Sequence, residues 1–258
     1  MSRPHPVRTV LNSAAGSVLI TLAAVSMLGA RIVTFGGARR FCAEVLGAWM
    51  SRAILAVLGV KVVVHAQEPL PTGQCVYTFN HTSTLDMFVL LSLGLPRTRY
   101  FMKRASWAMP PFGLAAWMVG TFFTPPQRLP AQRVRLFQAA TAKLRSTGDC
   151  VLLSPEGTRV TTGHIGPFNK GTFHLATELR APIVPLFIQI PPGSNPGKGL
   201  SSNPCTVHVH VLPAVSTSDW RLEDLERNKA LVRQRYVDFL DRLNASSTAS
   251  GVSLPTAA

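Results

Sequence analysis

The side chains of this chain that are best suited to chemistry are His81 and Asp86, in the segment Asn-His-Thr-Ser-Thr-Leu-Asp at residues 80–86. The apolar run Cys75–Phe79 before them predicts a strand, and Thr82–Thr84 are residue types that begin helices. His81 would then lie at the carboxyl end of a strand, where α/β sheets place their ligand sites. From one turn into the helix, Asp86 can reach one ring nitrogen of His81 and leave the other nitrogen as a base.

A purely structural interpretation of this pair is also open. His81 could be a satisfied turn histidine, and Asp86 a first-turn carboxylate that interacts favourably with the helix dipole. Ser83 could be a polar group of the site, although a capping role suffices for it. Taken alone, the pair favours the structural interpretation, and a second polar turn favours the catalytic one.

That second turn follows the buried-strand pattern Val151–Leu153 and reads Ser-Pro-Glu-Gly-Thr-Arg at residues 154–159. Glu156 could orient a substrate group or neighbouring hydrogen-bond donors. Arg159 has the planar guanidinium that binds a phosphate through two parallel hydrogen bonds. Gly-Thr turns are common, so this segment carries weight only together with the first motif.

In combination, the two motifs resemble the 1-acylglycerol-3-phosphate acyltransferase family. Further segments are similar to blocks of that family: Lys103, Pro-Phe-Gly at residues 111–113, Gly120, Phe-Asn-Lys-Gly at residues 168–171, and Ala-Pro-Ile-Val-Pro at residues 181–185. The order and spacing of these blocks make chance agreement improbable. The resemblance extends from about residue 15 to residue 215, which is most of the chain.

The resemblance implies a reaction that gives phosphatidic acid in phospholipid biosynthesis. A fatty acyl group would pass from acyl-CoA or acyl carrier protein directly to the free hydroxyl of 1-acylglycerol-3-phosphate. His81 would take the hydroxyl proton while Asp86 holds the imidazole. The chain has no Gly-x-Ser-x-Gly nucleophile elbow, which fits a transfer without an acyl-enzyme. Backbone near Gly157 is a candidate for stabilising the oxyanion.

The resemblance also implies a set of substrate-binding residues: Asn80, Lys103, Glu156, Gly157, Thr158 and Arg159. One departure concerns Arg128, which is displaced by two residues from the family's usual arginine and follows the pair Pro125-Pro126. This displacement leaves the acceptor open, and lyso-ornithine lipid is an alternative. A non-catalytic membrane-binding protein is a second alternative. The four intact site residues (His81, Asp86, Glu156 and Arg159) argue against that one.

Composition points to a lipid surface as a partner. Hydrophobic residues make up 47% of the 258 residues, charged residues 15%, and the net charge is +14. Such a chain suits anionic lipid headgroups and phosphorylated substrates. Nucleic acid is not expected, because there is no long basic block and no motif of interleaved aromatic residues. We expect no cofactor and no metal, since no cysteines have C-x-x-C spacing and His208 and His210 lack a third ligand at a fitting spacing.

The N-terminal region predicts a membrane anchor. No charged residue occurs between Arg8 and Arg31, and the apolar stretch 14–30 could be a cleaved signal peptide, a full span, or half of a re-entrant or interfacial helix pair. Arginines on both sides favour the helix pair with both ends cytoplasmic. A second segment, residues 40–60, resembles an interfacial helix with Trp49 at headgroup level. The expected location is therefore the cytoplasmic face of the cell membrane.

Strand–helix alternation after residue 60 predicts an α/β fold with helices on the faces of its sheet. The resemblance implies a mixed sheet flanked by helices with an N-terminal membrane-embedded two-helix motif. We expect anchoring helices at 1–60, a catalytic domain at 61–243 and a disordered tail at 244–258, with the four cysteines as buried free thiols. The predicted strands are Lys61–His65, Cys75–Phe79, Arg99–Met102, Val119–Phe123, Val151–Leu153, Ile183–Ile188 and Thr206–Leu212. The predicted helices are Thr84–Leu93, Pro130–Ser146, Lys170–Leu179 and Leu222–Leu243.

Overall fold

The computed structural model describes residues 6–195, 197, 199–200 and 202–249. Its centre is a seven-stranded sheet in which only the β6–β7 pair is antiparallel, so the predicted mixed α/β sheet is confirmed. The strands, in their order across the sheet, are β1 (Val60–Ala66), β7 (Cys205–Val211), β6 (Ile183–Gln189), β2 (Val76–Phe79), β5 (Cys150–Leu153), β3 (Thr98–Lys103) and β4 (Phe122–Thr124).

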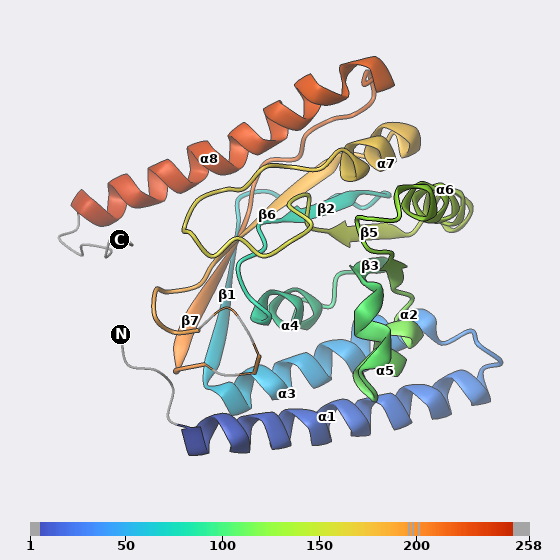
Figure 1. Ribbon diagram of the computed structural model, residues 1–258, viewed down its shortest axis with the longest axis vertical. Helices are drawn as coiled ribbons and strands as arrows, with labels where there is room; N and C mark the ends of the chain where they lie inside the picture. Colours follow the sequence, from blue (N-terminus) through green and yellow to red (C-terminus); the bar gives the residue numbers. More distant parts are fainter. Residues whose placement is uncertain (1–5, 196, 198, 201, 250–258) are drawn as a thin grey trace.

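Helices cover both faces of the sheet (Figure 1). On one face lie α1 (Pro6–Val33), α2 (Arg39–Phe41), the π-helix Cys42–Gly47, α3 (Ala48–Leu58), α4 (Leu85–Ser92), the 3-10 helix η2 (Arg104–Ala108) and α5 (Phe112–Met118). On the other lie α6 (Pro130–Thr147), α7 (Gly171–Leu179), the 3-10 helix η3 (Leu222–Asp224) and α8 (Leu225–Ala249). The two faces have separate hydrophobic cores.

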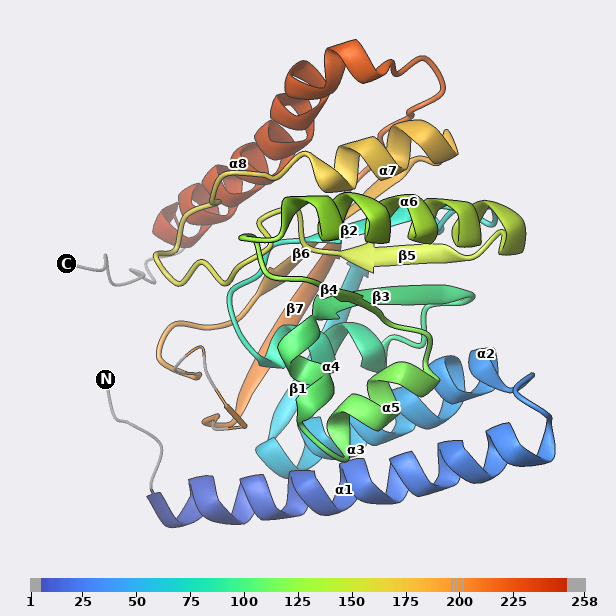
Figure 2. The ribbon, with the colours of Figure 1, turned by 45° about the vertical axis from the view of Figure 1, so that its right-hand side comes forward.

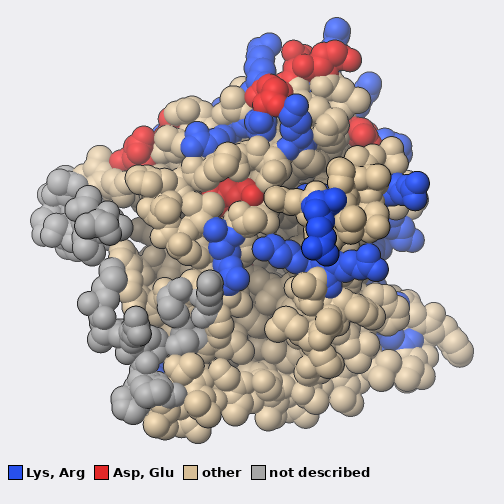
Figure 3. Space-filling model, viewed as in Figure 1, with Lys and Arg blue, Asp and Glu red and all other residues tan. Residues whose placement is uncertain are grey.

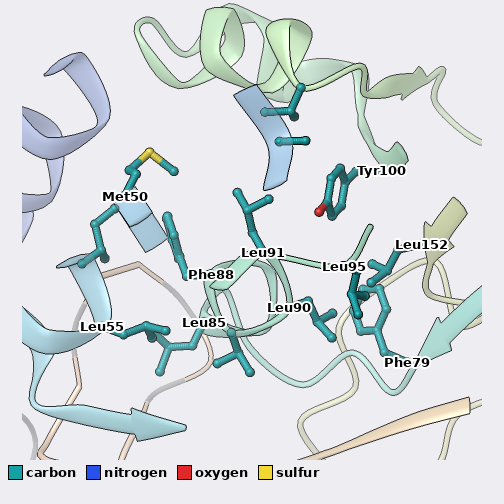
Figure 4. Close-up of a cluster of buried hydrophobic side chains, with 14 of the residues drawn as sticks. Met50, Leu55, Phe79, Leu85, Phe88, Leu90, Leu91, Leu95, Tyr100 and Leu152 are labelled. Atoms are coloured by element: carbon teal, nitrogen blue, oxygen red, sulfur yellow. The ribbon is translucent and has the colours of Figure 1, made fainter. Parts of the chain in front are cut away.

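Helix α4 lies in the middle of the first core (Figure 4). It packs against α3 through side chains such as Leu55, and against the sheet through Phe79 and Leu152. Because its sequence is apolar on every side, the one carboxylate that it carries, Asp86, is fully buried. A buried carboxylate must be hydrogen-bonded to be tolerated, and the partners of Asp86 define the site described below.

The N-terminal helices and the sheet form one packed unit. A buried carboxylate, Asp149, accepts hydrogen bonds from Arg39 in α2 and from Arg99 in β3, each at 2.8 Å. Burial alone would raise the pKa of Asp149. The hydrogen bonds from Arg99 and Thr147 and the charges of Arg39 and Arg99 outweigh burial and hold it below its ordinary value. Gly120 is required beside this cluster, because a Cβ there would lie 2.7 Å from Cδ of Arg39.

The segment at residues 40–60 has one side turned toward the protein and one side exposed, and Trp49 lies on the exposed side. Its polar side chains turn toward the protein: Glu44 accepts the backbone N–H of Arg97, and Arg52 donates to the carbonyl of Ser92. The apolar residues Phe41, Val45 and Trp49 are about half exposed. With α1, this segment makes two stretches, Val7–Val33 and Arg39–Leu58, that are long and apolar enough to cross a membrane.

Three local expectations are corrected. The predicted strand at Val119–Phe123 is shorter and begins later, because α5, which the sequence did not predict, occupies Phe112–Met118 and Gly120 adopts a φ of 88°. The last helix continues to Ala249, beyond the predicted start of a disordered tail, and residues 250–258 lie outside the described part. Of the four free cysteines, Cys42, Cys75 and Cys150 are buried as expected, whereas Cys205 is only partly so.

Candidate active site

The centre of the site is the pair predicted from the sequence. Nδ1 of His81 lies 2.9 Å from Oδ2 of Asp86, and the backbone N–H groups of Thr82 and Ser83 donate to the same oxygen at 2.7 and 2.8 Å. These donors satisfy the carboxylate in its apolar helix. An ionised carboxylate only accepts hydrogen bonds, so the imidazole proton lies on Nδ1 and Nε2 keeps a free electron pair. The side chain of His81 is 25% exposed, which leaves the ring open to a substrate.

Glu156 ties the second turn to the first. Its Oε2 accepts the backbone N–H of His81 at 2.6 Å, and its Oε1 accepts the backbone N–H of Gly166 at 2.8 Å. The carbonyl of His81 in turn accepts the N–H of Val160 at 2.7 Å. Burial raises the pKa of Glu156, although the two backbone donors oppose that rise. The His81 turn is thus held on both sides of its peptide backbone by the segment that follows β5.

Asn80 fixes the same turn to the sheet. Its amide donates to the carbonyl of Ile188 at 3.0 Å and accepts the N–H of Ile188 at 2.7 Å. The side chain is buried, like that of Glu156. Both residues therefore lie in the scaffold of the site, beneath the surface that a substrate reaches.

Arg159 lies next to the beginning of α4. Its Nη1 donates to Oγ1 of Thr84 at 2.6 Å and to the carbonyl of Gly197 at 2.8 Å, while the side chain stays exposed. Gly157 has a φ of 66°, and a Cβ there would lie 2.9 Å from Nδ2 of Asn169. The turn therefore requires glycine at that position.

The backbone near Gly157 was a candidate for stabilising the oxyanion, but the turn already uses its N–H group. The N–H of Gly157 donates to the carbonyl of Ser154 at 3.2 Å, so this donor already has a partner. Thr158, the next residue, is exposed.

Two more predicted cations lie at the same edge of the sheet. Tyr77 in β2, Leu152 in β5 and Tyr100 in β3 are register partners, so Lys103 at the end of β3 lies level with the end of β2. Lys103 is exposed, as is Arg128 in the loop after β4. Figure 3 shows Lys and Arg side chains around a hollow in this face of the molecule. An anionic substrate would meet a positive rim there.

Sequence reasoning missed one contributor, Arg233 in α8. Its Nε donates to the carbonyl of Gly166 at 2.9 Å and its Nη2 to the carbonyl of Ile165 at 2.6 Å. Gly166 is the residue whose N–H binds Glu156, so three successive hydrogen bonds, through Gly166 and Glu156, link Arg233 to the His81 turn. The residue is far from both motifs in the chain, and no sequence pattern identifies it.

An apolar cavity of about 30 Å³ lies close to the site, between α1, α3, α4, α5 and β3. Four methionines line it, Met27, Met50, Met87 and Met102, together with the inner face of α5. Methionine is flexible and adapts to irregular spaces, so these walls can rearrange more easily than branched side chains would allow. The cavity itself is too small for a fatty acyl chain.

His65 lies beside the two histidines of β7, His208 and His210, although the sequence did not indicate this cluster of three imidazoles. Nε2 of His65, in β1, lies 2.8 Å from Nδ1 of His208. The ring of His65 stacks on the ring of His210, with 4.6 Å between their centroids. Burial and the neighbouring charges of His65 and His208 lower the pKa of His210 to about 4. Within the described residues, no group of three His, Cys, Asp or Glu side chains has an arrangement that could hold a metal ion.

The sequence is similar to those of known acyltransferases. Residues 61–189, half of the chain, match the family model described as Acyltransferase. The chain is 24% identical over 224 residues to a 1-acyl-sn-glycerol-3-phosphate acyltransferase of Cocos nucifera (87% of this chain, 72% of the relative). It is 30% identical over 178 residues to the human 1-acyl-sn-glycerol-3-phosphate acyltransferase beta (69% of this chain, 64% of the relative).

Among solved structures, the fold is similar to that of the 1-acyl-sn-glycerophosphate (LPA) acyltransferase PlsC from Thermotoga maritima. The TM-score is 0.62 at 21% sequence identity, covering 87% of this chain and 96% of that one. The matched family region contains both motifs and the strands that position them. The chain therefore belongs to the Acyltransferase family and is an acyltransferase enzyme.

Proposed function

We propose that the enzyme transfers a fatty acyl group from a thioester donor to the free hydroxyl of 1-acylglycerol-3-phosphate, giving phosphatidic acid. The observation that carries this proposal is the contact between His81 and Asp86, which leaves Nε2 of His81 as a base in a partly exposed ring. The names of the two relatives described above support the choice of acceptor.

In the proposed reaction, Nε2 of His81 accepts the acceptor's hydroxyl proton while the oxygen attacks the thioester carbonyl carbon. A C–O bond forms, and the tetrahedral intermediate then collapses with cleavage of the C–S bond. The leaving thiolate takes the proton back from His81. Asp86 stabilises the imidazolium in between and holds the ring in the required tautomer. A positioned base of this kind contributes roughly 10²–10⁴-fold to the rate.

Arg159 is the residue we propose for the acceptor's phosphate. Both hydrogen bonds that hold it to described residues come from Nη1, so Nε and Nη2 remain for a phosphate oxygen. A guanidinium binds phosphate most strongly when two parallel N–H groups face two oxygens. Lys103 and Arg128 at the same edge would add longer-range attraction. The displacement of Arg128 keeps lyso-ornithine lipid as the competing acceptor.

The N-terminal helices are proposed to hold the enzyme at the cytoplasmic face of the membrane. The exposed apolar side chains of α1, among them Val18, Leu22 and Val25, are more than half accessible and would face lipid. The net charge of +14 suits anionic headgroups. The same charge suits either donor, since acyl-CoA carries phosphates and acyl carrier protein is acidic.

A transfer assay with the full chain in vesicles tests the proposal. Lysophosphatidic acid and lyso-ornithine lipid are offered separately, each with acyl-CoA and with acyl carrier protein as donor. Phosphatidic acid formed from lysophosphatidic acid is the expected product, and acylation of lyso-ornithine lipid alone would identify the competing acceptor. If no acceptor is acylated with either donor while the protein stays on the vesicles, it is a non-catalytic membrane-binding protein.

A further inference from the structure

The connection between β3 and β4 exposes large apolar side chains. It consists of η2 and α5, and Trp107, Met109, Leu114 and Trp117 on it are 49%, 60%, 37% and 48% exposed. The rings of Trp107 and Trp117 lie edge to face with their centroids 6.4 Å apart, so the exposed groups adjoin one another. An exposed cluster of this kind on a folded protein marks an interaction surface.

The surface is held rigidly. The ring of Trp107 packs edge-on against Phe123 of β4, with 5.4 Å between centroids. Gly113 passes so close to Trp107 that a Cβ would overlap its carbonyl oxygen. The other side of α5 contributes Phe112 to the wall of the apolar cavity. Trp107 and Trp117 are therefore presented by two packed elements, η2 and α5.

The same surface continues the outer side of α1. Figure 2 shows α5 beside α1, and the guanidinium of Arg31 lies over the ring of Trp117 at 5.3 Å. Leu28 and Ile32, on the last turns of α1, are exposed near Arg31 in the chain. In Figure 3 the part of the molecule below the hollow, where these helices lie, carries few charged side chains.

The charge pattern favours a lipid surface as the partner. No charged residue occurs between Arg104 and Arg128, just as none occurs between Arg8 and Arg31. Arg104 and Arg31 stand at the ends of these uncharged stretches, as cations at the edge of an apolar surface do when the surface enters a bilayer. Tryptophan prefers the boundary between headgroups and acyl chains, and anionic headgroups attract the arginines.

We propose that η2 and α5 form a second membrane-contacting surface, which inserts Trp107, Met109, Leu114 and Trp117 into the leaflet that holds α1. This proposal rests on the membrane association stated under the proposed function. Lys103 directly precedes η2 and lies at the edge of the sheet where the active-site residues gather. The second surface therefore sets the opening of the site at the level of the headgroups, where a lysolipid presents its phosphate and its free hydroxyl.

Quenching of tryptophan fluorescence by brominated lipid tests the proposal. The chain has four tryptophans, and four variants would each keep one of them and replace the other three with phenylalanine. Vesicles contain phosphatidylcholine and phosphatidylglycerol brominated on the acyl chains. We expect quenching of Trp107, Trp117 and Trp49, and none of Trp220, which packs against Phe173 on the opposite face of the sheet.

The outcomes separate this inference from the proposed membrane association. Quenching of Trp49 without quenching of Trp107 and Trp117 would overturn the inference and leave the anchor in place. Absence of quenching for Trp49, Trp107 and Trp117 alike would overturn the inference, and it would overturn the membrane association as well if the protein also failed to float with the vesicles. Quenching of Trp107 and Trp117 without quenching of Trp220 supports the second surface.

A partitioning measurement gives an independent readout. The double variant Trp107→Ser with Trp117→Ser is expected to bind vesicles at least about tenfold more weakly than the wild type, because it loses two large apolar side chains from the bilayer. Leu222→Ser is the matched control, since Leu222 is 46% exposed on η3, away from this surface, and should leave partitioning unchanged. Unchanged partitioning of the double variant, with a change in its oligomeric state in detergent, would show that the surface binds a second copy instead.

Discussion

The carboxylate of Glu156 accepts the backbone N–H of His81 at 2.6 Å, and this contact joins two turns that lie 75 residues apart in the chain. It explains why the second motif needs an acid at its third position. Arginine at the end of that turn is thereby brought to the beginning of α4, where Arg159 binds Thr84. One hydrogen-bonded unit therefore positions both the proposed base, His81, and the proposed phosphate ligand, Arg159.

Replacing the proposed base should abolish transfer. His81→Ala is expected to lower kcat roughly 10²–10⁴-fold, because an alanine side chain cannot take the hydroxyl proton. Initial rates of acyl transfer on vesicles measure the effect, and flotation with the vesicles checks that the variant still binds membrane. His174→Ala, in an exposed histidine of α7, is the control and should keep wild-type activity. Near-full activity of His81→Ala would show that the base is wrongly assigned.

The Asp86→Asn variant should keep the fold and lose most of its acyl-transfer activity. The hydrogen bonds from the His81 ring and from two backbone N–H groups all end on Oδ2 of Asp86, so the amide oxygen of asparagine can take over their geometry, but a neutral amide does not supply the negative charge that stabilises the imidazolium of His81. We expect kcat to fall on the order of 100-fold or more, with a much smaller change in KM. Steady-state kinetics at several pH values give both constants, and a changed KM with an intact kcat would contradict the role.

Arg159→Ala should weaken binding of the acceptor. The proposed charge-assisted contact predicts a KM for lysophosphatidic acid about tenfold higher or more, with a modest change in kcat. The KM for the thioester donor should stay the same. Arg227→Ala, in an exposed arginine of α8, is the matched control. An unchanged KM for the acceptor would remove Arg159 from phosphate binding.

Arg233 is expected to act as a positioning residue, through Gly166 and Glu156. Arg233→Ala removes the hydrogen bonds to the carbonyls of Ile165 and Gly166, so the Glu156 contact loses its support. We expect kcat to drop about tenfold with little change in either KM, and partial rescue by Arg233→Lys. A purely structural role would instead lower Tm and the amount of active enzyme without changing kcat per active site, as an active-site titration would show.

Asp149 is expected to contribute a pH-dependent part of the stability. Its pKa is depressed in the folded protein, so its contribution is fully present above the unfolded pKa of about 4 and is lost as the pH falls through the lower folded pKa. Asp149→Asn breaks a buried carboxylate's contacts with Arg39 and Arg99 and should destabilise the protein by about 3–5 kcal/mol at neutral pH. Thermal unfolding in detergent measures the difference in Tm, which should shrink below about pH 4. A difference that is constant with pH would contradict this account.

Much of the fold could be read from local patterns. The seven strands were predicted because each is a short apolar or β-branched run, and β2 and β5 are buried along their whole length. Helix α4 was predicted from the capping residues before an apolar segment. The sequence did not predict helix α5. An apolar run that contains glycine fits a strand as well as a buried helix, and the packing of this segment against α1 decides between them.

The structure divides the predicted site residues into two groups, those around the beginning of helix α4 and those in the scaffold beneath it. His81, Asp86 and Arg159 lie around the base of α4, whereas Asn80 and Glu156 are buried in the scaffold below them. The sequence could not distinguish a substrate-binding residue from a supporting one. A polar residue next to His81 looks the same in the sequence whether its side chain contacts the substrate or a backbone amide.

The sequence by itself determined the family and the hypothesis of acyl transfer, because His81, the carboxylate of Asp86 and the acidic second turn are recognisable by residue type and spacing. Tertiary structure alone decided what holds that chemistry in place. Arg233, for example, reaches the loop at Gly166 from α8. Tertiary structure likewise decided two contacts elsewhere in the molecule: His65 joins His208 across β1 and β7, and Trp117 adjoins Arg31 of α1. The reason is physical: such contacts join segments far apart in the chain, and their geometry follows from how strands pair and helices pack rather than from any local pattern of residues.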